Sequence, residues 1–320
     1  MIRFLIRRAL QALPLLFVIS ALVFALLHAA PGGPLAIYLS NPNVRPEDIE
    51  RLRRALGLDR PLWEQYWSWL AAFVRGDWGY SFSDGRAVIV RVAERLPATL
   101  ELVLVSIAGA LAIAVPAGMA AAAKRGGLFD RALGALSIAG ISLPSFWFGL
   151  LLQMLFAIGL GWLPSSGRTT PGEGDLIDHA RHLVMPAAVL ALVQAASWSR
   201  YLRGSMIDAL SQPFILAARS RGVPARRVLL VHALTTALGP VLAVVMMDAA
   251  LLVSGAVVTE SVFAWPGMGK LLIDSIGVLD RPVIVAYLLI IVTFFILINL
   301  IVDVLYSALD PRVRLSEAKG

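Results

Sequence analysis

Side chains that could bind a metal ion are scattered through this sequence. His179 and His182 are three residues apart, close to Asp175 and Asp178, and this spacing could ligate a metal ion on a helix. Because such spacings recur by chance, we favour a solvated loop beside a membrane surface over a metal site. The chain contains no cysteine, which excludes disulfides, thiolate metal sites and thiol catalysis.

A short glycine-containing segment, PGMGK around Lys270, is similar to part of a phosphate-binding loop. However, Leu271 stands where Ser or Thr would have to reach Mg²⁺, and Ala264 occupies the position of the leading glycine. No paired catalytic residues can be assigned within the apolar runs. We therefore expect no catalytic residues, no metal site and no cofactor in this chain, and no ATP hydrolysis by the chain alone.

The most unusual polar residue is Asp248, which interrupts the apolar run VLAVVMMDAALLVSG. An acid in hydrocarbon is costly, so it should face the interior of a helix bundle or a wet cavity. A place on a passage through the bundle and a structural hydrogen-bonding role both remain open. Met247, Ser254 and Gln153 are the other candidates for lining such a passage.

Four arginines interrupt two apolar runs in LAARSRGVPARRVLLVHAL, residues 216–234. A short helix can run from Phe214 to Arg221, Gly222 can end it, and Pro224 suits the first turn of a second helix. The pattern predicts a helix–turn–helix elbow. A DNA-binding elbow needs a free second helix for the major groove, whereas this one merges with an apolar run, so we expect no nucleic-acid partner.

The surface of this elbow combines small and basic side chains. Ala217 and Ala218 permit close contact with another surface, and the arginines would hold the elbow at lipid headgroups or at an acidic protein surface. These arginines are Arg219, Arg221, Arg226 and Arg227. The sequence therefore predicts a docking protrusion.

Long apolar helices must position all these residues. Hydrophobic residues make up 58% of the 320 residues, only 15% are charged, and the mean hydropathy is +0.78. A helix needs about 20 mainly apolar residues to cross a bilayer. Six runs approach this length: about 9–29, 98–122, 132–160, 183–203, 235–258 and 283–307. The sequence predicts an all-α integral membrane protein with six transmembrane helices, since a barrel would show alternating strands.

Basic residues gather in the segments that lie inside if the N-terminus is cytoplasmic. Arg3, Arg7 and Arg8 precede the first run, and the elbow adds its four arginines, whereas the outer segments balance bases with acids. The first run is longer than a typical signal peptide and lacks a clear small-residue cleavage site, so we interpret it as a retained anchor. Both termini and the elbow are predicted to be cytoplasmic.

The connections between the runs predict a partly helical extracytoplasmic segment between the first two spans. RPEDIERLRRALGL has the pattern of a capped amphipathic helix. The crowded Trp63, Tyr66, Trp67 and Trp69 favour a helix at the lipid headgroups over a ligand cage. The connection 161–182 has the composition of a loop.

The predicted domain division follows from these segments. Residues 1–29 form the N-terminal end and first span, and 30–97 the extracytoplasmic segment. Residues 98–307 form a five-helix core with a cytoplasmic docking loop, 204–234, and an extracytoplasmic loop, 259–282. Residues 308–320 form a cytoplasmic tail.

The elbow resembles the cytoplasmic EAA loop of permease subunits in ABC importers, which docks into a cleft of the ATPase subunit. The match covers Ala217, Ala218 and Gly222, with Leu216 in place of the usual acid and Thr235 in place of a late proline. Nine blocks, in order along nearly the whole chain, resemble the dipeptide and oligopeptide branch of this family. They include RGDWGYSF, SLPSFWFGLLL, ARSRGVPARRVLLVHAL and ESVFAWPGMGKLLIDSI. Asp248 departs from the family pattern, in which a neutral amide is more usual.

This resemblance implies a type I importer permease that forms half of a passage for di- or oligopeptides in a bacterial cytoplasmic (inner) membrane. It implies a homologous second permease subunit, two P-loop ATPase subunits that bind ATP and Mg²⁺, and an extracytoplasmic solute-binding protein. The implied docking residues are Ala217, Ala218, Arg219, Arg221, Gly222, Val223 and Arg226. Related permeases carry nickel chelates or glutathione. An ion-coupled secondary transporter is the alternative of another class, although the sequence shows no broken helices or repeated halves.

Overall fold

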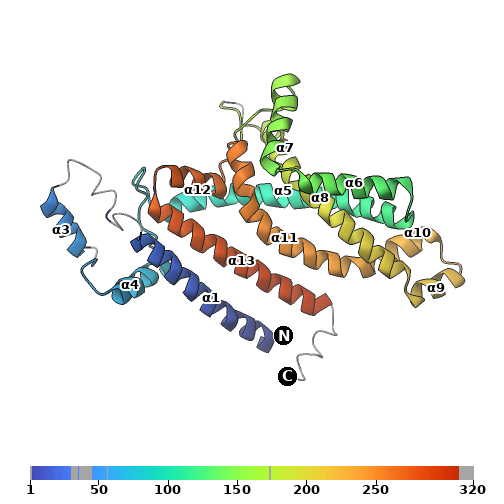
Figure 1. Ribbon diagram of the computed structural model, residues 1–320, viewed down its shortest axis with the longest axis horizontal. Coiled ribbons are helices and arrows are strands. Elements are labelled where there is room, and N and C mark those ends of the chain that lie inside the picture. The colour runs from blue at the N-terminus through green and yellow to red at the C-terminus, as the bar shows by residue number, and fades with distance from the viewer. Residues whose placement is uncertain (1, 30–34, 36–44, 56, 173, 310–320) are drawn as a thin grey trace. The chain divides into compact units, whose positions relative to one another are not determined.

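The computed structural model describes residues 2–29, 35, 45–55, 57–172 and 174–309, and every long regular element in these ranges is helical (Figure 1). The helices are α1 (Ile2–Ala29), α3 (Pro46–Ala55), α4 (Leu62–Val74), α5 (Val88–Ala123), α6 (Leu128–Ser142), α7 (Ser145–Leu152), α8 (Leu176–Leu210), α9 (Pro213–Ser220), α10 (Ala225–Arg227), α11 (Leu234–Val262), α12 (Met268–Gly277) and α13 (Arg281–Leu309), with π-helical segments η2 (Gln153–Gly159) and η3 (Val228–Ala233). The predicted all-α class is confirmed.

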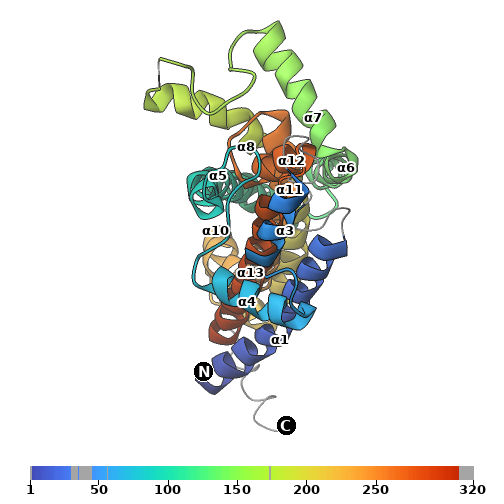
Figure 2. The ribbon, with the colours of Figure 1, turned by 90° about the vertical axis from the view of Figure 1, so that its left-hand side faces the viewer.

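Five helical stretches among the described residues are long and apolar enough to cross a membrane. They are Leu10–Ala29, Val88–Ala123, Leu176–Leu210, Ala225–Val253 and Arg281–Val302. The expected span over 132–160 is not one helix, because α6 and the stretch Ser145–Gly159 meet at a bend of 100° (Figure 1 and Figure 2). Counting this bent pair as one span gives six.

Pro144 explains the bend. A proline lacks the backbone N–H that a helix needs and disfavours the helical conformation in the residue before it. Leu143 accordingly takes an extended conformation, with φ −82° and ψ 128°. The expectation that the chain has no broken helix is therefore wrong at this position.

The chain forms two compact units, Met1–Leu96 with Leu271–Ile296, and Pro97–Lys270 with Leu297–Gly320. In the first unit, α4 packs on α1. The buried Tyr66 hydroxyl lies 2.8 Å from Ser20 Oγ, within hydrogen-bonding distance, and its ring meets Phe24 edge to face. Trp63 and Trp67 remain 65% and 53% exposed. The aromatic run is thus a helix, but part of it faces the core of its own unit.

In the second unit, α8 and α11 pack along each other and share an extended apolar cluster. Trp198 on α8 is fully buried and lies in this cluster with Val241 and Val245 of α11. Gly118 of α5 approaches α8 closely, since a Cβ at this position would lie 2.8 Å from the Ser199 carbonyl oxygen.

The loop expected over 161–182 ends earlier, because α8 begins at Leu176. Asp175 is its N-cap, and the Asp175 carboxylate accepts a hydrogen bond from the backbone N–H of Asp178 at 2.6 Å. His179 and His182 therefore lie in the first turns of a helix and not in a solvated loop. His182 is buried.

Candidate functional site

The elbow, defined here as residues 213–234, belongs to the second unit and turns sharply at Gly222. Gly222 has φ +78°, a conformation that glycine adopts without a Cβ penalty. Its N–H donates to the Arg219 carbonyl at 2.9 Å, and the Val223 N–H donates to the Ala218 carbonyl at 3.2 Å. These two bonds form a Schellman motif, which ends α9 and satisfies its last carbonyls.

The second arm of the elbow begins immediately afterwards. The sequence predicts Pro224 in the first turn of this helix. In the structure Pro224 is instead the N-cap of α10, one position before the first turn. Its carbonyl accepts hydrogen bonds from the Arg227 and Val228 N–H groups, at 2.9 and 3.0 Å. The π-helical η3 then leads into α11, so the arm continues into a candidate span as expected.

Two buried side chains fix the elbow to its unit. Ile215 of α9 and Val228 of η3 are almost completely buried, and both belong to the apolar cluster that contains Trp198. Val223 packs against the same cluster from the turn. The elbow is therefore anchored to its unit at both arms and at the turn.

The outer surface of the elbow is uncovered in this chain. Phe214 and Leu216 are 45% and 58% exposed. The predicted docking residues on this surface are Ala217, Arg219, Arg221, Gly222 and Arg226, whereas Ala218 and Val223 are half-buried. Within the described residues no ion pair involves an elbow arginine. The elbow thus presents apolar and positively charged groups together.

The structure gives Asp248 a defined partner. The Trp198 indole Nε1–H donates to Asp248 Oδ2 at 2.7 Å, and this tryptophan is completely buried. Asp248 itself is half-buried, and the neighbouring Met247 is 57% exposed. The structural role is therefore present, and the residue as a whole is only half-buried. The Ser254 side chain lies outside the described part of the structure.

Gln153 lies apart from Asp248. Its Nε2 group, on η2, donates to the Ser165 carbonyl at 2.8 Å and to the Val262 carbonyl at 3.1 Å. Val262 ends α11, fourteen residues after Asp248 and therefore about 21 Å further along the helix. The structure does not bring these two pathway candidates together, and the pathway role of Gln153 stays a prediction.

Glu260 is a buried acid that the sequence analysis missed. Its Oε1 accepts from the Thr99 hydroxyl at 2.6 Å, and its Oε2 accepts from the backbone N–H groups of Gly269 and Lys270 at 2.7 and 3.1 Å. The carboxylate thereby caps the N-terminal end of α12, where free N–H groups favour negative charge.

The same contacts explain the glycines of PGMGK. A Cβ on Gly267 would lie 2.2 Å from Glu260 Oε1, and one on Gly269 would lie 2.3 Å from Val257 Cα. The glycines are needed for close packing inside the protein and not for a phosphate. The sequence signal for this contact is a pair of glycines, Gly267 and Gly269, that flank one residue and follow Glu260 closely.

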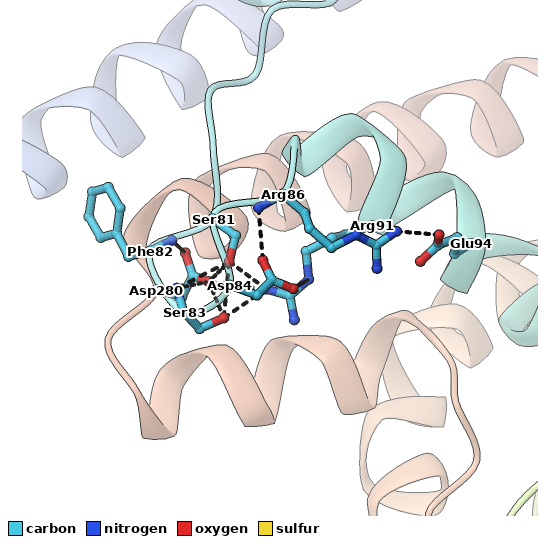
Figure 3. A network of polar contacts seen from close by, with 8 residues as sticks. All are labelled: Ser81, Phe82, Ser83, Asp84, Arg86, Arg91, Glu94 and Asp280. Carbon is cyan, nitrogen blue, oxygen red and sulfur yellow. Dashed lines mark hydrogen bonds and ion pairs between the residues drawn. The ribbon is translucent and has the colours of Figure 1, made fainter.

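A second missed network lies in the first unit and centres on Asp280 (Figure 3). This fully buried carboxylate accepts from the Ser81 hydroxyl at 2.5 Å and the Phe82 N–H at 2.9 Å, and it pairs with Arg91 Nη1 at 3.2 Å. Asp280 directly precedes α13. Its carboxylate therefore ties the start of this helix to the turn after Gly79, about 200 positions away in the chain.

Asp84 extends this network at the surface (Figure 3). The Arg86 backbone N–H donates to Asp84 Oδ1 at 3.1 Å and is the main cause that holds the pKa of Asp84 below its usual range. The Ser81 hydroxyl and the Arg91 guanidinium lower this pKa further. The contacts of this turn therefore favour the ionised form of Asp84.

His179, one of the two histidines whose spacing could ligate a metal ion, has a carboxylate as its partner. His179 Nε2 forms a short contact with Glu101, and Arg168 Nη2 donates to the same carboxylate at 2.7 Å. His182 Nδ1 lies 2.9 Å from the Asp178 carbonyl. Among the residues that the structure describes, no three histidine or acidic side chains are grouped as metal ligands would be.

Residues 114–315 match the family described as binding-protein-dependent transport system inner membrane component, and residues 1–103 match the N-terminal model of such membrane components. The di/tripeptide transport system permease protein DppB of Pseudomonas aeruginosa is 38% identical, and the dipeptide transport system permease protein DppB of Escherichia coli is 36% identical. The glutathione transport system permease protein GsiC of Escherichia coli is also 38% identical.

Each of these alignments covers 98% of this chain and 99% of the relative. The elbow and the buried Glu260 lie inside the first matched family region, and the network around Asp280 spans both matched regions. The fold is that of a type I ABC importer permease, with five or six candidate spans in the described residues. The chain belongs to the family of binding-protein-dependent transport system inner membrane components.

Proposed function

We propose that this chain forms one half of the membrane passage of an ATP-driven importer for di- and tripeptides. Family membership supports the transport role, and the names of two relatives, which specify di/tripeptide and dipeptide transport, support the cargo. The equally similar glutathione permease makes glutathione the second candidate cargo. Glutathione is itself a small peptide, so one chemical class covers both.

The observation that carries the proposal is the exposed surface of the elbow. Its apolar Phe214 and Leu216 need cover, and four arginines near them have no ion-pair partner among the described residues. An acidic, partly apolar cleft on another protein would satisfy both requirements. We assign this cleft to an ATPase subunit that binds ATP and Mg²⁺.

The other partners follow from the same arrangement. A second, homologous permease would complete the passage and present its own elbow to a second ATPase subunit. An extracytoplasmic solute-binding protein would deliver the peptide to the segments 30–97 and 259–282. This arrangement requires cytoplasmic termini and a cytoplasmic elbow, which the distribution of basic residues supports.

Purification in mild detergent tests the assembly. We expect a second permease and two P-loop ATPases to copurify with this chain, as identified by mass spectrometry. Recovery of the chain alone, or as a homodimer with uptake driven by an ion gradient, would refute the importer assignment.

Substitution of Gly222 by aspartate tests the docking surface. A Cβ at Gly222 meets no atom within 4 Å, so the strain at φ +78° stays local and the chain should still insert and fold. Gly172→Asp is the matched control, because Gly172 has φ +90°, open space around it and a position outside the elbow. We expect Gly222→Asp to lower ATP-dependent uptake at least about tenfold, a loss of about 1.4 kcal/mol in coupling, and Gly172→Asp to leave it unchanged. Normal uptake with Gly222→Asp would remove the elbow from the mechanism.

A further inference from the structure

Asp248 places an acidic group in a strongly apolar helix. It is the central residue of α11, with fourteen residues before it and fourteen after it. An ionised carboxylate in a membrane span is expensive unless it meets water or a positive charge. In its ionised form Asp248 therefore needs water or a positively charged group beside it.

The only bond that the described residues make to this carboxylate comes from a neutral group. The Trp198 indole N–H, 2.7 Å from Oδ2, holds the carboxylate in one orientation but supplies no charge. No ion pair within the described residues includes Asp248. One oxygen is thus bonded, and Oδ1 has no described donor.

Asp248 lies beside an exposed face of α11. Val245 and Ala249 are buried, whereas Met247 and Leu251 are 57% and 58% exposed. Asp248 is half-buried and lies between these two faces. The buried Trp198 lies on the packed side of Asp248, and the exposed side is the one on which a ligand would have to bind.

We propose that Asp248 binds the ammonium group of the transported peptide. An alkylammonium ion has a compact charge and three N–H donors, so it can bond Oδ1 while the indole keeps Oδ2. The peptides of the proposed cargo class, and glutathione, each carry one free α-ammonium group. This inference rests on the proposed function and adds a specific contact to it.

A cysteine beside Asp248 can report its charge. The chain has no native cysteine, so Leu251→Cys introduces a single thiol, three residues from Asp248 and therefore about 5–6 Å away on the helix surface. The complete importer in lipid nanodiscs is treated with two reagents of similar size, 2-aminoethyl methanethiosulfonate, a cation, and 2-sulfonatoethyl methanethiosulfonate, an anion. The ratio of their reaction rates measures the local preference for an ammonium ion.

We expect the cationic reagent to react faster than the anionic one. Adding Asp248→Asn should lower the ratio of the two rates at least about tenfold, because a unit charge at this distance attracts the cation and repels the anion even in water. Asp248→Glu should restore most of the preference. Millimolar dialanine should protect the thiol from the cationic reagent, and N-acetyl-dialanine should not.

Three outcomes would overturn the inference: an unchanged ratio with Asp248→Asn, a thiol that neither reagent reaches, or loss of the second permease from the Asp248→Asn complex. The last would mean that a base of the second permease is the partner of this acid. Copurification and uptake, measured in the same preparations, decide the proposed importer function separately. An importer that assembles and transports but shows no charge preference refutes only the ammonium site.

Discussion

Replacing Gly269 with alanine tests how tightly α11 and α12 are packed around Glu260. The added Cβ would lie 2.3 Å from Val257 Cα and 2.9 Å from Val257 Cγ2. Since a Cα atom cannot swing aside as a side chain can, the two helices must move apart. The same movement would pull the Gly269 N–H away from the Glu260 carboxylate, to which it now donates at 2.7 Å.

The expected magnitude follows from three effects. Overpacking a core costs about 2 kcal/mol in a typical case. Weakening a hydrogen bond to a buried charged group costs about 2 kcal/mol more, and the better helix propensity of alanine returns about 1 kcal/mol. The net loss of about 3 kcal/mol should lower the apparent Tm by about 6–12 °C, at about 2–4 °C for each kcal/mol.

Gly277→Ala is the matched control. Gly277 is the last residue of α12, and a Cβ there meets no atom within 4 Å, so this variant should keep the Tm of the unchanged chain. Tryptophan fluorescence during heating of the detergent-purified importer can follow both variants. Trp265 is a useful reporter because it is fully buried next to the substituted segment. If the Gly269→Ala and Gly277→Ala variants unfold within about 2 °C of each other, the close contact does not stabilise the fold as argued.

Two further predictions concern the first unit. The pKa of Asp84 lies below its ordinary 3.8, so its carboxylate stabilises the folded turn above that value and loses this effect as pH falls through the folded-state pKa. Asp84→Asn should therefore speed hydrogen exchange in residues 80–87 at pH 7, with a smaller effect as the pH falls below 3.8, and equal exchange at pH 7 would contradict this. Trp63 and Trp67, both more than half exposed, should be quenched by lipids brominated near the headgroup. The double Trp→Phe variant should lose that quenching, and undiminished quenching would place other tryptophans at the lipid.

The sequence predicted the elements whose signals are local. Gly222 and Pro224 define the turn of the elbow through backbone rules that need no tertiary contact, and the observed helix ends differ from the predicted ones by one residue. The bend at Pro144 had an equally local signal. The apolar run around Pro144 nevertheless predicted one straight span, because hydropathy indicates burial in lipid and not the direction of the backbone.

The contacts that the sequence did not reveal join distant positions. Thr99 and Glu260 are 161 residues apart, and Arg91 and Asp280 are 189 apart. Each acid sits in or beside a strongly apolar segment, where composition alone marks it as costly but cannot name its partner. The turn of the elbow was therefore predictable from residues that are neighbours in sequence, its docking role stays a prediction, and the distant partners of the buried acids appeared only with the fold.

The elbow and Asp248 are parts of one packed assembly. Ile215 and Val228, which anchor the elbow, lie in the same apolar cluster as Trp198, which orients the Asp248 carboxylate. Close-packed interiors transmit displacement because they contain little free volume to absorb it. If the ATPase shifts the elbow as proposed, the movement reaches Trp198 through these contacts and reaches Asp248 through one 2.7 Å hydrogen bond. A neutral amide at this position could keep the indole bond, whereas the acid adds the negative charge that the proposed ammonium contact uses. In the proposed mechanism, Asp248 therefore links movement of the elbow to binding of the peptide.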